Sequence, residues 1–244
     1  MDLIEICDFR KTFGSKEVHK GVTFSVRRGE CMGLIGGSGA GKSVILRSII
    51  GLEKPDGGTI RIDGQEVSAL REDELIDVRK KVAYCFQGGA LFDSMTVFDN
   101  LAYPLREHTK LGEAEIAQKI YGELEEFGLM GNERIYPGSL SGGMQKRVGV
   151  ARAIIMGPEV VLYDEPTAGL DPYNTRKMQE MILRLKSKGV TSILVTHDMP
   201  SAYAVCDRIA MLMDGKIVGL GTPEELDSSA GGLIQKFING ELGT

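Results

Sequence analysis

The chain reads Gly36-Gly37-Ser38-Gly39-Ala40-Gly41-Lys42-Ser43 between an apolar segment and a run of helix-forming residues. This spacing fits the pattern G-x-x-x-x-G-K-[ST], in which backbone N–H groups at the start of a helix cradle phosphate oxygens. Lys42 adds a mobile positive charge, and the Ser43 hydroxyl can bind magnesium. Because residues 31–35 predict a buried strand and residues 44–50 predict a helix, the context that the pattern requires is present. The stretch therefore predicts a phosphate-binding strand, loop and helix of an α/β protein.

Two adjacent carboxylates, Asp164 and Glu165, follow the continuous apolar segment 160–163. Neighbouring side chains of a strand point opposite ways, and the ends of parallel strands often carry ligands. Asp164 is suited to magnesium, through a water molecule. Glu165 then lies where it could polarise the water that attacks a γ-phosphate, since phosphoryl transfer depends mainly on positioning and charge.

A second glycine-containing turn reads Leu140-Ser141-Gly142-Gly143-Met144-Gln145-Lys146-Arg147. Ser141 can cap the helix that follows, and the two glycines keep side chains away from the positive end of that helix. A helix start alone would explain Ser141 but not the glycine pair, which costs conformational entropy. The pattern predicts a second anion cradle.

The rest of the chain predicts strands at 3–9, 22–26 and 59–62, a helix at 112–130, and a strand, helix and strand at 160–163, 174–187 and 192–196. The last three elements indicate a parallel sheet. We find no internal repeat or heptad run, which argues against a coiled-coil insertion or a duplicated unit.

Composition narrows the class of protein further. Acidic residues number 34 and basic residues 29, so the net charge of -5 gives no general attraction for nucleic acid. No apolar run approaches the roughly 18 residues that span a bilayer. The 4 cysteines lack the CxxC spacing of zinc or redox sites. We expect a cytoplasmic protein with reduced thiols.

With the second glycine turn in place, the chain resembles the ATPase subunits of ABC transporters along nearly its whole length. The resemblance implies a single ABC ATPase domain over 1–244, with an α/β P-loop NTPase (RecA-like) core of parallel sheet, an antiparallel β subdomain and an inserted helical subdomain. It places the catalytic core at 1–87 and 158–226, the helical subdomain at 88–157 and a C-terminal tail at 227–244.

The resemblance also assigns roles to single residues. Gln87 would sense magnesium and the γ-phosphate, His197 would be the switch histidine, residues 168–171 would form the D-loop, and Phe13 would stack on adenine. The implied catalytic residues are Lys42, Gln87, Glu165 and His197, and the implied ligands of Mg²⁺ are Ser43, Gln87 and, through water, Asp164. The implied ATP contacts are Phe13, Gly36, Gly37, Ser38, Gly39, Ala40, Gly41, Lys42, Ser43, Val44, Gln87, Ser141, Gly142, Gly143, Gln145, Asp164 and Asp171. Val44 departs from the family, where many members have Thr.

In the resembled family two copies face head to tail, so that Ser141 of one copy caps the ATP held by the phosphate loop of the other. The stretch 88–108 lies where such ATPases meet their membrane partner, and it resembles that of the Mla and MCE-type lipid transporters. Leu91, Phe92, Met95, Phe98 and Leu101 could form the floor of a groove there. A helical stripe at 233, 234, 237 and 238 is similar to a tail in the same group.

If this resemblance holds, the chain powers phospholipid transport between inner and outer membranes from the cytoplasmic face of the inner membrane. Its partners would be a second copy, a permease dimer, a periplasmic MCE-domain protein and a small STAS-domain subunit, without nucleic acid. An importer ATPase for a polar solute such as an amino acid shares every catalytic motif and stays open as an alternative. A soluble ABC ATPase outside transport is a third hypothesis, although it usually has insertions that this chain lacks.

Overall fold

The larger of two sheets has six strands in the order β10-β9-β3-β8-β7-β6. The computed structural model describes residues 2–228 and 232–239. The strands are β3 (Cys31–Ile35), β6 (Val82–Cys85), β7 (Val160–Asp164), β8 (Thr191–Val195), β9 (Arg208–Met213) and β10 (Lys216–Gly221). All pair in parallel except β10, which forms an antiparallel pair with β9. Since parallel strands need crossover connections, helices follow most of these strands.

The smaller sheet is antiparallel, in the order β2-β1-β4-β5. Its strands are β1 (Asp2–Phe13), β2 (Lys16–Arg27), β4 (Gly57–Ile62) and β5 (Gln65–Glu66). The strands predicted at 3–9 and 22–26 form the open end of this longer β1–β2 hairpin, away from its turn. Its two-residue turn contains Gly14 at φ 59°, a left-handed conformation that glycine adopts without strain.

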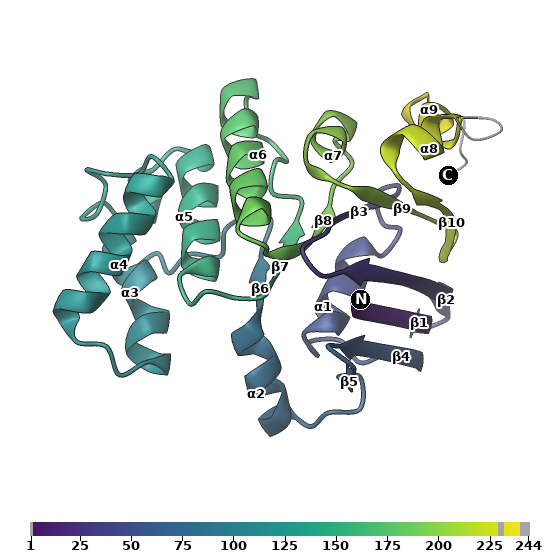
Figure 1. Cartoon of the computed structure of the whole chain (residues 1–244), viewed down its shortest axis with the longest axis horizontal. Helices are drawn as coiled ribbons and strands as arrows, with labels where there is room; N and C mark the ends of the chain where they lie inside the picture. The colour runs from purple at the N-terminus through teal and green to yellow at the C-terminus, as the bar shows by residue number, and fades with distance from the viewer. Residues whose placement is uncertain (1, 229–231, 240–244) are drawn as a thin grey trace.

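Helices cover both faces of the larger sheet (Figure 1). Helix α1 (Lys42–Ile49) packs between the two sheets, and α2 (Glu72–Lys81) precedes β6. Helices α6 (Pro172–Ser187) and α7 (Met199–Val205) share the core on the opposite face with α3 (Val97–His108), α4 (Glu113–Glu126) and α5 (Gly142–Ile154). A short 3-10 turn, η1 (Pro137–Ser139), precedes α5, and α8 (Pro223–Ser228) and α9 (Leu233–Ile238) follow β10.

Strand β7 shows how alternate residues build two cores. Val161 and Tyr163 belong to the core under α3–α7, whereas Val160 and Leu162 belong to the core shared with α1 and the smaller sheet. All four are buried. A strand with both faces covered is apolar throughout, which explains the continuous apolar run in the sequence.

The model corrects some expectations about helices. The helix expected at 112–130 ends at Glu126, two residues before Gly128, whose φ is 62°. Helix α3, which contains Pro104, was not predicted from the sequence. Thr96 caps this helix by accepting a hydrogen bond from the N–H of Asp99 at 3.1 Å. The proposed division at 87, 157 and 226 stays a prediction.

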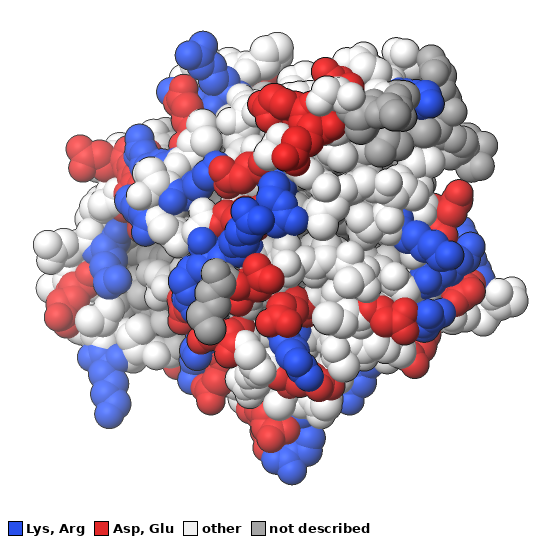
Figure 2. Space-filling view, turned by 45° about the vertical axis from the view of Figure 1, so that its right-hand side comes forward, with Lys and Arg blue, Asp and Glu red and all other residues white. Residues whose placement is uncertain are grey.

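Of the apolar stripe expected near the C-terminus, Phe237 on α9 is half-buried against the larger core. The side chains of Leu233, Ile234 and Ile238 lie outside the part of the chain that is described. Within the described ranges, no helix is both long and apolar enough to cross a bilayer. On the face displayed in Figure 2, acidic and basic side chains are interspersed, and no large area carries one sign.

Candidate active site

The phosphate loop connects the end of β3 to the start of α1, and close packing explains its glycines. Gly41 has φ 91°, and a Cβ added there would lie 2.6 Å from the imidazole ring of His19. A Cβ added at Gly36 would lie 2.4 Å from the carbonyl oxygen of Leu212. Both distances are shorter than any normal contact, so larger side chains would displace the loop.

Lys42 is held inside this loop. Its Nζ donates hydrogen bonds to the carbonyl oxygens of Gly36 at 2.8 Å and Gly37 at 2.9 Å. Burial lowers the pKa of Lys42, and the nearby carboxylates of Glu165 and Asp164 oppose that shift. The ammonium group of Lys42 is therefore only partly removed from water, and its present partners are neutral carbonyls. It can exchange these carbonyls for phosphate oxygens.

Asp164 accepts hydrogen bonds on both of its oxygens. The hydroxyl of Ser43 donates to Oδ1 at 2.7 Å, and that of Tyr84 donates to Oδ2 at 2.7 Å. Burial, followed by the contact with Asp164, raises the pKa of Tyr84 well above its usual value. A hydroxyl and a carboxylate oxygen this close are suitable ligands for Mg²⁺, which prefers oxygen and keeps several waters. In the described ranges no group of three or more His, Cys, Asp and Glu is placed to hold a metal, so phosphate and water would supply the other ligands.

Glu165 begins the loop after β7 in an unusual backbone conformation. Its φ is 52°, and its N–H is fixed by a hydrogen bond to the carbonyl of Val195 at 2.9 Å. Nδ1 of His197 lies 2.9 Å from Oε2 of Glu165, an ion-pair distance when the imidazole is protonated, although the alignment is not that of a hydrogen bond. A left-handed non-glycine residue stores strain, and such residues occur often in functional sites.

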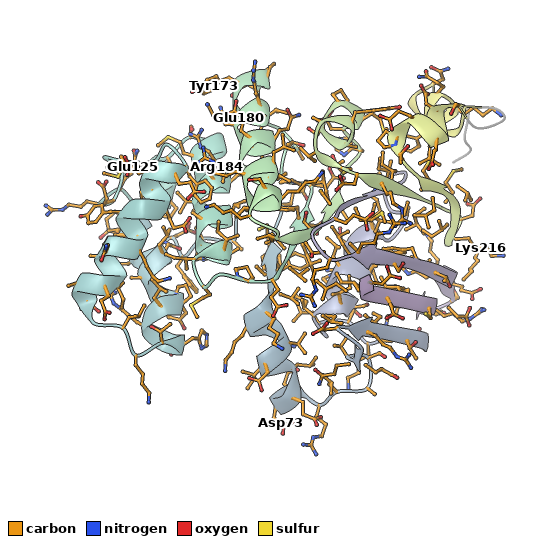
Figure 3. All side chains as sticks on the ribbon, viewed as in Figure 1. Asp73, Glu125, Tyr173, Glu180, Arg184 and Lys216 are labelled. Atoms are coloured by element: carbon orange, nitrogen blue, oxygen red, sulfur yellow. The ribbon has the colours of Figure 1, made fainter. Side chains whose placement is uncertain are left out.

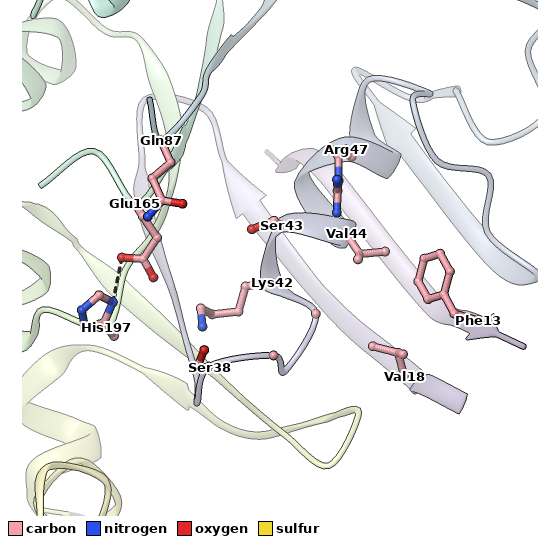
Figure 4. Close-up of a pocket in the computed structure, with 12 residues that line it drawn as sticks. Phe13, Val18, Ser38, Lys42, Ser43, Val44, Arg47, Gln87, Glu165 and His197 are labelled. Atoms are coloured by element: carbon pink, nitrogen blue, oxygen red, sulfur yellow. Dashed lines mark ion pairs between the residues drawn. The ribbon is translucent and has the colours of Figure 1, made fainter. Parts of the chain in front are cut away.

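Of the side chains described above, those of Lys42, Ser43, Glu165 and His197 face a cavity of about 630 Å³ (Figure 4). Its walls are formed by Phe13, Val18, Ser38, Gly39, Gly41, Lys42, Ser43, Val44, Arg47, Gln87, Glu165 and His197. Figure 4 shows Lys42, Gln87, Glu165 and His197 at one end and Phe13 and Val18 at the other. The ring of Phe13 is 44% exposed and lies 5.2 Å from Nζ of Lys11. The cavity thus has one polar end and one aromatic end.

The second glycine turn lies outside this cavity. Ser141 caps α5 by accepting a hydrogen bond from the N–H of Met144 at 3.3 Å. Asp171 caps α6 by accepting a hydrogen bond from the backbone N–H of Asn174 at 2.9 Å. This bond, together with one from the side chain of Asn174, lowers the pKa of Asp171. Gly143 lies against Asn174, because a Cβ added at Gly143 would be 2.5 Å from Cγ of that residue. The first turn of α5 and the first turn of α6 are therefore in direct contact.

Of the expected contacts, several do not line the cavity. They are Gly36, Gly37, Ala40, Ser141, Gly142, Gly143, Gln145, Asp164 and Asp171. Gln145 is turned toward its own loop, where Nε2 donates to the carbonyls of Pro137 at 3.0 Å and Leu140 at 3.2 Å. Sequence reasoning missed Val18, Arg47 and Tyr84, which belong to no short motif and reach the site only through the pairing of strands and the packing of α1.

Comparison with known proteins places this geometry in a family. A family model described as "ABC transporter" matches residues 19–168. The chain belongs to the ABC transporter family. As a member, it is an ABC-type ATPase.

Relatives of this ABC ATPase carry transport names. It is 41% identical over 238 residues to the "Probable ribonucleotide transport ATP-binding protein mkl" of Mycobacterium leprae (strain TN), covering 97% of this chain and 69% of the relative. It is 38% identical over 240 residues to the "Intermembrane phospholipid transport system ATP-binding protein MlaF" of Escherichia coli (strain K12), covering 98% and 89%.

A solved structure of a related cassette supports the fold. The dimeric ATP-binding cassette MJ0796, in a post-hydrolysis state bound to ADP and Pi, superposes on this ABC ATPase with a TM-score of 0.84 and 30% identity. The match covers 90% of this chain and 98% of that one. The parallel core with its antiparallel and helical parts is therefore the fold of an ABC cassette, as the sequence predicts.

Proposed function

We propose that this chain is the ATP-hydrolysing subunit of a transporter that moves phospholipid between membranes. The observation that carries the ATPase part is the cavity, which brings Lys42, Ser43, Gln87, Glu165 and His197 together from separate segments of the chain. The name of the Escherichia coli relative supports the phospholipid part, because that relative aligns with nearly the whole chain.

In this proposal the triphosphate of ATP lies on the phosphate loop. Lys42 leaves the carbonyls of Gly36 and Gly37 and donates to phosphate oxygens, which carry more negative charge. Phe13 stacks on adenine at the other end of the cavity, where its exposed ring gains apolar contact. Loop amides and the start of α1 complete the anion cradle.

Mg²⁺, held by Ser43, Gln87 and, through water, Asp164, would supply the positive charge that stabilises the phosphate oxygens. Glu165 holds the attacking water by accepting a hydrogen bond from it. His197 positions the carboxylate of Glu165 and contacts the γ-phosphate. The placement of Ser43, Gln87, Glu165 and His197 on the wall of the cavity supports these roles.

A second copy would complete the site. Ser141, Gly142 and Gly143 cap α5 and do not line the cavity of their own chain. The related cassette MJ0796 is dimeric, which supports an arrangement in which this turn meets the nucleotide of the partner. Closure around ATP and opening after hydrolysis would then drive the transporter between two states.

The membrane partner is proposed to dock beside α3. A cavity of about 340 Å³ there is lined by Ile76, Pro104, His108, Arg152 and Met156, among others. Phe92 and Tyr103 are exposed nearby, with ring centroids 5.2 Å apart. Leu101 is fully buried, so it belongs to the core and cannot face a partner as the sequence suggested.

A permease dimer bound beside α3 would keep the chain on the cytoplasmic face of the inner membrane. The assembly would also contain a periplasmic MCE-domain protein and a small STAS-domain subunit.

The cargo is tested by purifying the tagged chain with its partners from native membranes and identifying the copurified proteins and lipids. We expect a permease, an MCE-domain protein and bound phospholipid. Recovery of a solute permease with a soluble binding protein, and no MCE-domain protein, would contradict the phospholipid assignment.

A second candidate cargo is a polar solute. It is favoured by the name of the Mycobacterium leprae relative, which refers to ribonucleotide transport. The two candidates share the ATPase chemistry and differ in which cargo should raise the rate of ATP hydrolysis. ATP turnover of the purified complex that rises with phospholipid vesicles and not with ribonucleotides favours the first, and the opposite response favours the second.

A further inference from the structure

A second charged cavity, of about 250 Å³, lies between the C-terminal end of α4, α5 and α6. Its lining shares no residue with the nucleotide cavity. Figure 3 labels four of the residues around it, Glu125 on α4 and Tyr173, Glu180 and Arg184 on α6. The group that it receives from α5 is Arg147.

Arg147 is buried without a partner. The residue is 9% exposed, and its Nε–H is enclosed and donates no hydrogen bond. Across residues 2–228 and 232–239, its guanidinium group has no ion pair, hydrogen bond or ring contact. A guanidinium group carries five N–H donors and stays charged, so leaving it unpaired in the interior is unfavourable.

The acidic groups of the cavity do not neutralise Arg147. Glu180 pairs with Lys177 at 2.9 Å, and Glu126 pairs with Lys188 at 2.6 Å and with Arg184 at 3.7 Å. Arg184 also donates to the backbone carbonyl of Glu126 at 3.0 Å. Glu126 and Glu180 are thus matched by cations, Glu125 forms no ion pair among the described residues, and Arg147 is the buried cation that lacks a partner.

We propose that this cavity binds a small carboxylic acid whose carboxylate pairs with Arg147. Guanidinium and carboxylate groups fit each other in two parallel hydrogen bonds. Since one water occupies about 30 Å³ of liquid volume, the cavity has room for about eight water-sized groups, enough for a short acid. Met181 provides an apolar wall for its carbon chain. Three glutamates at the rim disfavour a more highly charged anion such as phosphate.

The test is calorimetric titration of the whole chain with sodium butyrate, which carries a single carboxylate, at constant ionic strength and without nucleotide. We expect saturable binding that weakens at least tenfold in Arg147→Met, which keeps a long side chain and removes the guanidinium group. The matched control is Lys216→Met, which removes a charge from the exposed strand β10 far from the cavity in Figure 3. Its affinity for butyrate should equal that of the unchanged chain.

Two surface variants keep the inference testable if Arg147→Met does not fold. Lys177→Met removes a cation at the cavity and one of the two cations paired with Glu180, so it should weaken butyrate binding. Glu125→Gln removes a negative charge and should tighten butyrate binding. Absence of saturable binding, binding unchanged in the folded variants, or tighter binding of inorganic phosphate than of butyrate would overturn the inference. Because no nucleotide is present, such failure would leave the proposed ATPase chemistry unaffected.

Discussion

Lys42 and Glu165 line the same cavity but have different partners. Lys42 is hydrogen-bonded to two carbonyls of its own loop, whereas Glu165 lies beside the imidazole of His197. The first contact involves neutral acceptors that a phosphate can replace, and the second involves a group that can hold a carboxylate in place. The two residues should therefore affect binding and hydrolysis separately.

Replacing Lys42 by Ala should weaken ATP binding by at least about tenfold, because a charged hydrogen-bond donor to phosphate is lost. Fluorescent ATP-analogue titration measures this. The control is Lys119→Ala, which removes an exposed lysine of α4. Equal affinity of the Lys42 variant and the control would show that the loop lysine does not reach the nucleotide.

Replacing Glu165 by Gln should leave ATP binding intact and slow hydrolysis by about 100-fold or more, because an amide is a poor acceptor for the proton of the attacking water. Single-turnover hydrolysis with excess enzyme separates this step from product release. Turnover close to that of the unchanged chain would count against Glu165 as the group that holds water.

His19 gives the chain a predictable acid sensitivity. The residue is fully buried beside Gly41, with both ring nitrogens unpaired, and burial lowers its pKa from 6.5 to about 4. Between these values the unfolded chain binds the proton and the folded chain does not. Stability is therefore complete above pH 6.5 and falls as the pH drops toward 4, by up to about 3 kcal/mol.

Replacing His19 by Leu should remove this part of the pH dependence. Urea unfolding at pH 7 and pH 4.5 measures the effect in the unchanged protein and in the Leu variant. The free energy of unfolding of the Leu variant, relative to that of the unchanged protein, should be higher at pH 4.5 than at pH 7. Parallel loss of stability in both chains on acidification would show that His19 does not titrate in this window.

At the scale of elements, the contact between α5 and α6 links the second glycine turn to the loop after β7. Gly143→Ala places a methyl group 2.5 Å from Cγ of Asn174, so it should destabilise the fold by about 1–3 kcal/mol. The double variant Gly143→Ala with Asn174→Ala should lose less stability than the sum of the two single variants, as measured by urea unfolding. Additive losses would indicate that the two helices do not press on each other here.

Local patterns predicted most elements because their signals are short in sequence. The phosphate loop, β7 and β8 are read from continuous residues, and so are Asp164 and Glu165. Helix α3 was missed since Pro104 interrupts its pattern, although Thr96 caps it and four of its apolar residues are buried, namely Val97, Leu101, Ala102 and Leu105. Tyr84 was missed because its contact with Asp164 depends on β6 pairing with β7, which no local pattern specifies.

At the scale of the whole molecule, the phosphate loop and the second glycine turn, which is the proposed second cradle, are built on different parts of the fold. The phosphate loop joins β3 to α1 in the sheet core, and Ser141 caps α5 among the helices. The cavity receives no residue from the second cradle of its own chain. This separation is the reason that a second copy enters the account.

The most direct test traps the Glu165→Gln variant with ATP and Mg²⁺ and determines the structure of the resulting species. The account predicts a dimer in which Ser141 of each copy contacts the γ-phosphate bound to Lys42 of the other. A monomer that binds ATP with its own residues alone would contradict the account. So would a dimer in which both Ser141 side chains lie away from every γ-phosphate.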